Sequence, residues 1–488
     1  MVKSGRLICT ALVAALSGMG LFAENSISVH QRWPWNEIVD IDVSIGAHGS
    51  DYDLVATWDG CPTGRTIQSI PSAYGDYHFK WDPRTAGLTS KTLNNFTVTL
   101  KRVRPSDRLF MAIWFTNTLD KVTAAGGTFY PGDVTYYATL PAYTSNIEQR
   151  RLLFRRVRAY DDNGNQIVYT NGYSDAILDM QFPNGATCSR LRDVKGLPLR
   201  EVRFSSDYWI MTMPIQAAAA WPTCMNLSQR HGPNNKSFIN NWGCNSINYR
   251  CDNIRGTAAE GVSWPDGGFT VAPNSYIGQA RAWMKRNGVF EKLGSEMILD
   301  LPTSAQWETA ARAGTDGNQI FAPKPDAVGY GPITASSTPG DVTNTLGNAW
   351  VDADLLPEHV HVVTKGLSIW YFNRYAQGHT ANGKKNVNTN VARVDPNAWG
   401  IYDMPGIQRE WALGYSVGTT SIHAGEDPVC ATAGSTRYVT FGCSQDANNA
   451  ANGESAMSYI PGNYAHKNPD EIALNFRLVL NTKNWLNR

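Results

Sequence analysis

The sequence predicts an α+β protein in two parts: a β-sandwich-like domain over residues 24–145, and a larger domain over residues 146–488 that is poor in regular secondary structure. Short runs of alternating apolar and polar residues, separated by Gly, Pro, Asp and Asn, predict the first part. Beyond about residue 147 the sequence changes to loops rich in Gly and Asn with few helices, which predicts the second part. The length of 488 residues is ample for more than one domain.

Residues 1–23 have the order of a secretory signal peptide. Lys3 and Arg6 precede an apolar run from Leu7 to Leu16, and small residues end at Ala23. The run is shorter than the roughly 20 apolar residues that a membrane-spanning helix needs, although a signal anchor is the alternative. We therefore expect a protein without a membrane span that is secreted, periplasmic or held at the cell surface.

Four runs with a period of two define the expected N-terminal strands: Val39–Ile45, Leu54–Trp58, Tyr77–Trp81 and Phe96–Leu100. Such alternation places one face of each strand in a core and the other in solvent. The stretch 127–142 is expected to supply the last strands or a bridge into the second domain. None of these runs contains a catalytic constellation, so we expect a spacer, docking or adhesion module.

Charge gives no sign of a nucleic-acid partner. The chain has 43 basic and 42 acidic residues, so no net field draws it to polyanions. One basic run alternates with apolar residues: Arg150, Arg151, Arg155, Arg156 and Arg158. We interpret this run as a strand with a solvated basic face.

The cysteine count is odd once the signal peptide is removed. Seven cysteines then remain: Cys61, Cys188, Cys224, Cys244, Cys251, Cys430 and Cys443. In an oxidising compartment, local bridges between Cys244 and Cys251 or between Cys430 and Cys443 are plausible, with at least one thiol left free or paired between chains. No spacing typical of a structural zinc site is present.

Two helices are predicted in the second part from their capping residues. Ser275 is the expected N-cap of the first helix, which ends at Gly288. Thr303 and Gln306 form the capping box of the second, and Gly314 follows its end.

Three segments in the second part carry a resemblance to a known family. They are Leu301–Gly314 (LPTSAQWETAARAG), Asn397–Trp411 (NAWGIYDMPGIQREW) and Asn475–Val479 (NFRLV). In this order they resemble the motifs of the formylglycine-generating enzymes, also called sulfatase-modifying factors. The resemblance implies a compact α+β fold related to C-type lectins, held together by buried aromatic side chains.

In active members of this family, a cysteine of a sulfatase is oxidised to formylglycine with oxygen and a copper ion held by two cysteines. The corresponding segment here keeps Ser444, but Cys443 is the last cysteine of the chain. The resemblance places Ala447 and Asn452 where the two copper cysteines belong. Because paired thiolates are the ligands that select Cu(I), we expect no copper site. Cys443 and Ser444 remain the candidate catalytic residues.

The family also binds structural calcium through an Asn and a Glu of one turn and through a second, Asn-centred loop. The matching turn keeps Glu410 but has Ile407 in the Asn position, and Asn373 is the candidate in the second loop. Since Ca²⁺ takes about six to eight oxygen ligands, we expect at most degenerate calcium sites at Glu410 and Asn373.

Two functions of different classes remain open from the sequence. The first is a non-catalytic binding protein whose aromatic and Asn-rich loops present a surface to a protein, peptide or glycan ligand. The second is a formylglycine-generating oxidase that uses Cys443 and Ser444. The state of the thiols separates them, because the oxidase needs an accessible, reactive thiol and the binding protein needs none.

Overall fold

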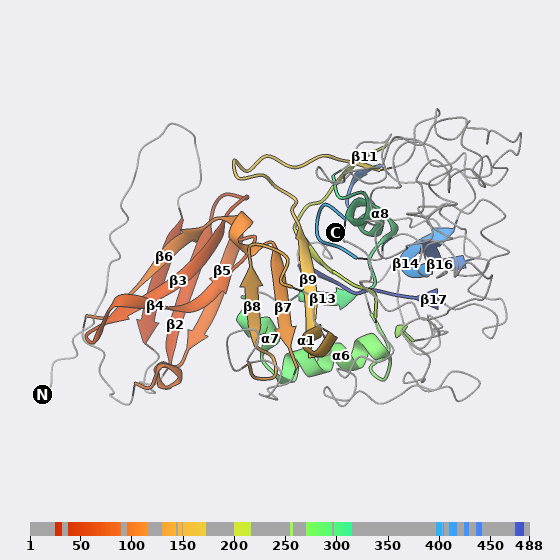
Figure 1. Ribbon diagram of the computed structural model, residues 1–488. Coiled ribbons are helices and arrows are strands. Elements are labelled where there is room, and N and C mark those ends of the chain that lie inside the picture. Colours follow the sequence, from red (N-terminus) through yellow and green to blue (C-terminus); the bar gives the residue numbers. More distant parts are fainter. Residues whose placement is uncertain are drawn as a thin grey trace, which may run out of the picture.

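The computed structural model of the chain describes residues 25–31, 38–88, 95–115, 129–142, 145–148, 150–171, 200–215, 254–256, 270–294, 297–314, 397–402, 404, 409–416, 424–428, 436–441 and 474–482. Within these ranges, a unit made mainly of strands at the N-terminal end lies beside a larger part that contains the α-helices (Figure 1). None of the described helices combines the length and apolar character needed to cross a membrane.

The N-terminal unit consists of two three-stranded antiparallel sheets, with the orders β1-β2-β5 and β4-β3-β6. The strands are β1 Ser26–Gln31, β2 Val39–Ile45, β3 Asp51–Trp58, β4 Cys61–Ile70, β5 Gly75–Trp81 and β6 Thr97–Val103. Apolar side chains of both sheets, among them Ile41, Leu54 and Trp81, form one hydrophobic cluster. All four strands predicted from alternation are present.

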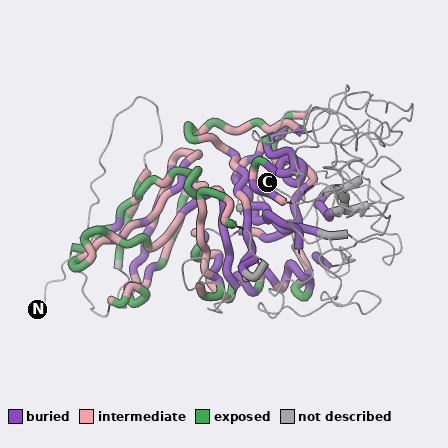
Figure 2. Tube along the Cα trace, in the orientation of Figure 1, coloured by how far each residue is buried: buried purple, intermediate pink, exposed green. Residues whose placement is uncertain are grey.

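The larger part is built on a six-stranded antiparallel sheet with the order β13-β18-β12-β9-β7-β8. Its strands are β7 Phe110–Trp114, β8 Val134–Tyr137, β9 Arg151–Val157, β12 Tyr208–Met211, β13 Met297–Asp300 and β18 Val479–Thr482. Buried side chains of this sheet and of residues 276–293 belong to one hydrophobic cluster, and Figure 2 shows many buried residues in this part of the chain.

Two strands of the six-stranded sheet, β7 and β8, precede residue 145 in the chain. Strand β7 pairs with both β8 and β9. All five residues of β7 are buried, so this strand does not alternate as the N-terminal strands do. A strand buried on both faces fits the interior of a covered sheet. The 3₁₀ turns η1 Pro83–Ala86 and η2 Pro105–Arg108 precede β7 in the chain.

The remaining elements surround the six-stranded sheet. Two small sheets have the orders β10-β11-β15 and β16-β14-β17. The strands are β10 Tyr169–Asn171, β11 Arg200–Arg203, β14 Arg409–Ser416, β15 Gly425–Glu426, β16 Thr436–Phe441 and β17 Leu474–Asn475. The helices are α1 Ser145–Glu148, α6 Tyr276–Arg286, α7 Val289–Leu293 and α8 Ser304–Arg312.

The predicted helix caps are confirmed. The hydroxyl of Ser275 accepts a hydrogen bond from the backbone N–H of Gly278 at the start of α6. At the start of α8, Thr303 accepts from the N–H of Gln306 at 3.2 Å, while the side chain of Gln306 accepts from the N–H of Thr303 at 3.0 Å. This reciprocal pair satisfies two backbone donors that a helix N-terminus otherwise leaves unpaired.

Buried ion pairs join the N-terminal unit to the larger part. The guanidinium of Arg156 on β9 donates two hydrogen bonds of 2.8 Å to the carboxylate of Asp51 on β3. Its Nε donates to Asp207, just before β12, at 2.5 Å. Burial alone would lower the pKa of Arg156, but Asp207 and Asp51 outweigh it, so the pKa is raised. Arg108 pairs with Asp53 of β3 at the same junction.

The predicted solvated basic face over residues 150–158 is wrong. The side chains of Arg151 and Arg156 are each 2% exposed. Arg151 pairs with the equally buried Glu148, three residues earlier, and stacks over Trp114. A buried arginine is tolerated only when carboxylates compensate its charge, and those of Arg156 come from segments about 50 to 100 residues away.

A stack of three rings also bridges the junction. His48, between β2 and β3, lies between Tyr74 and Tyr160, with ring centroids 3.6 Å and 4.0 Å away. Tyr74 belongs to the N-terminal unit, whereas Tyr160 follows β9. Burial lowers the pKa of His48, and the carboxylate of Asp207 offsets only part of that effect.

We expect the His48→Phe variant to lose less stability than the wild-type protein does when the pH falls into the mildly acidic range. Because the folded-state pKa of His48 lies below its ordinary value of 6.5, the unfolded chain binds the proton more readily. The stabilising contribution is therefore present above about pH 6.5 and is lost as the pH falls through the folded-state pKa. Phe keeps a ring in the stack and takes up no proton. Thermal unfolding at about pH 7.5 and about pH 5 should show a smaller fall in midpoint for the variant than for wild type. Equal falls would contradict the assignment.

Candidate functional site

The three motif segments meet at one buried polar centre. Glu410 on β14 comes from the second segment, Trp307 on α8 from the first, and Arg477 from the third, between β17 and β18. The Nε and Nη2 of Arg477 each donate to the Glu410 carboxylate at 2.6 Å, and Nε1 of Trp307 donates to it at 2.8 Å. Segments that are distant in sequence are thus fixed together by a bidentate ion pair.

Further hydrogen bonds connect this centre and the motif segments to neighbouring parts of the chain. Arg477 also donates to the backbone carbonyls of Met211 and Tyr402, both at 3.1 Å. The side chain of Asn397 donates to the carbonyl of Ala310 at 2.9 Å and accepts from the backbone N–H of Ile401, which ties the second segment to α8. The side chains of Arg477 and Glu410 are 0% and 1% exposed. The centre is therefore part of the interior and offers no open surface to a ligand.

Both oxygens of Glu410 are already engaged. Oε1 accepts from Arg477, and Oε2 accepts from Arg477 and Trp307. A calcium ion at this carboxylate would have to share it with a guanidinium, and the two cations would repel each other. No group of three or more side chains suited to metal binding occurs in the described ranges. The donor set at Glu410 thus fits an ion pair better than a calcium site, and calcium binding at Glu410 stays an untested prediction.

The predicted catalytic pair lies just outside the described residues. Strand β16 ends at Phe441, which is paired in register with Glu410 on β14. Cys443 and Ser444 follow Phe441 in the chain by two and three residues, and they fall outside the description, as do the positions predicted to replace the copper cysteines. Asn373 also lies outside it. Among the predicted site residues, only Glu410 is placed.

The sequence interpretation did not assign the partners of Glu410. Arg477 stands within the apolar run Phe476–Val479, where every residue is buried. A charged side chain inside such a run signals a buried ion pair, because an uncompensated buried charge is strongly destabilising. The same signal applies to Arg312 and Glu308 on α8, which pair with each other while Glu308 also pairs with Arg200. Which residues are joined could not be deduced from spacing alone.

The only one of the seven cysteines within the described ranges is Cys61, at the start of β4, and its thiol is free. The predicted bridges between Cys244 and Cys251 and between Cys430 and Cys443 lie outside the description.

Comparison with protein families identifies the class of this molecule. The model of the FGE-sulfatase family, described as a sulfatase-modifying factor enzyme 1-like domain, matches residues 179–479, more than half of the chain. The chain therefore belongs to the sulfatase-modifying factor family, as its motifs predict. No curated protein sequence matches it.

The solved structures that are similar to this chain include the following two. One is PvdO from Pseudomonas aeruginosa, with 13% sequence identity, a TM-score of 0.34, and coverage of 68% of this chain and 95% of PvdO. The other is Treponema denticola variable protein 1, with 15% identity, a TM-score of 0.32 and the same coverage of both chains. Identities and TM-scores this low indicate nothing about activity or ligand.

Proposed function

We propose that this protein is an exported binding protein that uses the sulfatase-modifying factor fold without copper chemistry. The observation that carries the proposal is that Cys443 is the last cysteine of the chain, so the expected segment supplies one thiolate where Cu(I) requires two. The residues present therefore do not fit the copper ion. The order of charged and apolar residues in 1–23 supports export.

In this proposal the centre around Glu410 has a structural role. The charged groups that the three motifs bring together are used to hold the interior, and both carboxylate oxygens are engaged by donors. Loops between the short strands would then carry the ligand surface, as is usual where a rigid scaffold supports connecting segments. We propose a protein, peptide or glycan as the ligand, and we propose that the two N-terminal sheets form a β-sandwich module.

One observation keeps an oxidase as the second candidate. Phe441 pairs with Glu410, and Cys443 and Ser444 follow Phe441 in the sequence by two and three residues. A single activated thiol at Cys443 would be able to act as a nucleophile if it were accessible and deprotonated.

Copper titration separates the two candidates. We expect the reduced mature protein to bind Cu(I) no more tightly than its Cys443→Ser variant, because one thiolate cannot provide two-coordinate Cu(I). The measurement is a competition titration against a Cu(I) chelator, together with mass mapping of Cys430 and Cys443 before and after reduction. A disulfide between these two cysteines would support the binding protein. Tight Cu(I) binding by wild type that is lost in Cys443→Ser would support the oxidase instead.

A further inference from the structure

Strand β1 has one free edge within the described chain. The sheet order is β1-β2-β5, and β1 pairs with β2 alone, over six consecutive positions without a register shift. In an antiparallel pair, every second residue of an edge strand turns its backbone N–H and C=O away from its neighbour. The edge of β1 therefore offers regularly spaced hydrogen-bonding groups to another strand.

The other edges of the N-terminal unit carry features that hinder strand addition, and β1 carries none of them. Lys80 lies on β5, and Lys101 on β6. Strand β4 contains Pro62, and its pairing with β3 is interrupted by register shifts. Lysine, proline and bulges are the usual means by which proteins block their sheet edges. The sequence of β1, SISVHQ, has no lysine or proline, and its pairing has no bulge.

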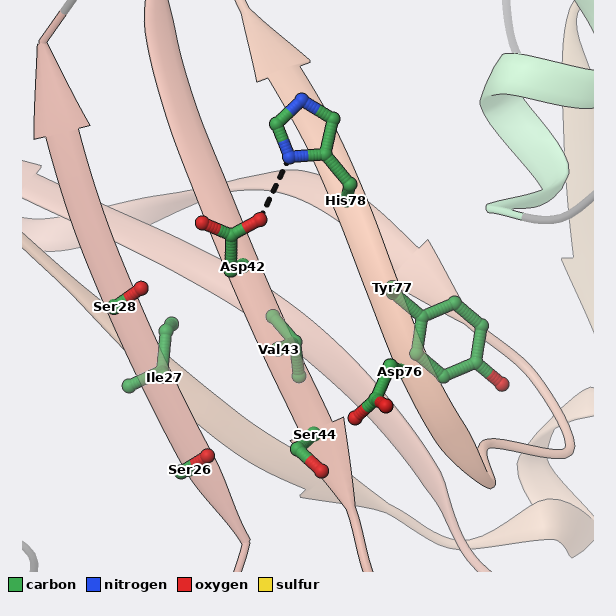
Figure 3. Close-up of a pocket in the computed structure, with 9 residues that line it drawn as sticks. All are labelled: Ser26, Ile27, Ser28, Asp42, Val43, Ser44, Asp76, Tyr77 and His78. Carbon is green, nitrogen blue, oxygen red and sulfur yellow. Dashed lines mark hydrogen bonds and ion pairs between the residues drawn. The ribbon is translucent and has the colours of Figure 1, made fainter.

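A groove lies on the outer face beside this edge (Figure 3). It has a volume of about 360 Å³ and is lined by residues of β1, β2 and β5. Two rows cross the sheet there, one made of Ser28, Asp42 and His78, and the other of Ser26, Ser44 and Asp76. Nδ1 of His78 lies 2.7 Å from Oδ1 of Asp42.

The chemistry of this face favours a cationic ligand. The exposed outward carboxylates of the three strands are Asp42 and Asp76, and they share this face with Lys80, His30 and His78. Asp40 also lies at an outward position, but its side chain is only 7% exposed and lies 3.5 Å from Nε2 of His78. Asp42 and Asp76 line the groove itself, with three serine hydroxyls beside them. Carboxylate and hydroxyl oxygens accept hydrogen bonds, which suits ammonium and guanidinium donors. The aromatic residue that lines the groove, Tyr77, packs against Phe79 beneath the sheet, so a stacking platform for a sugar ring is not supplied by these residues.

We propose that the edge of β1 and the acidic face beside it bind an extended, lysine- or arginine-rich segment of a partner protein, which adds as a fourth strand to the sheet. Backbone hydrogen bonds along the edge supply the general affinity, and alternate basic side chains of the segment lie over the groove. A second copy of this chain fits less well, because pairing β1 with its own copy would bring two acidic faces side by side.

A synthetic peptide tests the proposal on the mature full-length protein. The probe is a capped, fluorescent peptide of about eight residues in which lysine alternates with valine, so that lysines occupy one face of a strand. Binding is followed by fluorescence anisotropy at low and high salt. We expect binding at low salt that weakens as salt screens the aspartates. A peptide with glutamate in place of lysine, and a lysine peptide with a central proline, should bind at least tenfold more weakly.

Variants of the protein locate the site. Asp42→Asn and Asp76→Asn should each weaken binding of the lysine peptide by about two- to fivefold, as expected for exposed charges. Ser28→Lys places a blocking cation on the exposed face of the edge strand and should abolish binding. Asp107→Asn, an exposed carboxylate on η2 away from this sheet, is the matched control and should bind as wild type does.

Three results would overturn the proposal. They are no binding of the lysine peptide at low salt, equal binding by wild type and the Asp42→Asn/Asp76→Asn double variant, and a wild-type dimer that Ser28→Lys converts to a monomer. The last result would assign the edge to a second copy of the chain. None of these outcomes depends on copper or on Cys443, so the proposed function is tested separately.

Discussion

The Arg156→Ala variant should lose about 3–5 kcal/mol of its free energy of unfolding. Removal of the guanidinium leaves Asp207 without this cation and Asp51 with Arg108 at 3.9 Å, and the two carboxylate side chains are only 6% and 0% exposed. Because Asp51 belongs to the N-terminal unit and Asp207 to the larger part, the loss should also weaken the connection between them. Urea denaturation followed by tryptophan fluorescence and circular dichroism measures both effects.

The control for this prediction is Arg104→Ala. Arg104 also pairs with an aspartate, Asp107, but its side chain is 80% exposed. Exposed pairs contribute little, so this variant should unfold within about 1 kcal/mol of wild type. If Arg156→Ala unfolded as the control does, the ion pairs would not be what holds the two parts together.

The second large effect is expected for Glu410→Gln. The amide keeps the shape of the side chain but leaves Arg477 as a buried cation without a counter-charge, which should cost about 3–5 kcal/mol of stability. The variant Glu201→Gln, at a carboxylate that is 66% exposed, should be nearly neutral by comparison. Chemical denaturation in the presence and absence of Ca²⁺ measures the difference.

Two outcomes distinguish the ion pair from a calcium site. If the pair with Arg477 is the role of Glu410, the loss is the same with and without Ca²⁺, and a Glu410→Met/Arg477→Met double variant recovers part of it, since replacing both partners removes the uncompensated charge. A loss that occurs only in the presence of Ca²⁺ would contradict this account and support calcium binding by Glu410.

Local patterns in the sequence were enough to predict the elements whose causes are local. The alternation in Val39–Ile45 predicts β2, and the spacing of Thr303 and Gln306 predicts the start of α8. A period of two and a capping box both act within a few residues, so a single segment contains the information.

Predictions that depended on distant partners were less successful. The arginines of β9 alternate with apolar residues as a solvated strand would, but Asp51 and Asp207 draw Arg156 into the junction. The fully buried run of β7 likewise joins the six-stranded sheet through its pairing with β9, a contact that its own sequence does not specify. At Glu410 the fold brings Arg477 and Trp307 to the carboxylate, and the spacing of the motifs does not specify these partners.

The proposal that this chain binds its partner and does not oxidise it is tested most directly by an activity measurement. The mature, reduced protein is incubated with copper, oxygen and a cysteine-containing sulfatase peptide, and mass spectrometry follows conversion of the cysteine to formylglycine. We predict that wild type and Cys443→Ser convert no more peptide than copper alone does. Conversion by wild type that is lost in Cys443→Ser would contradict the proposal and establish an oxidase.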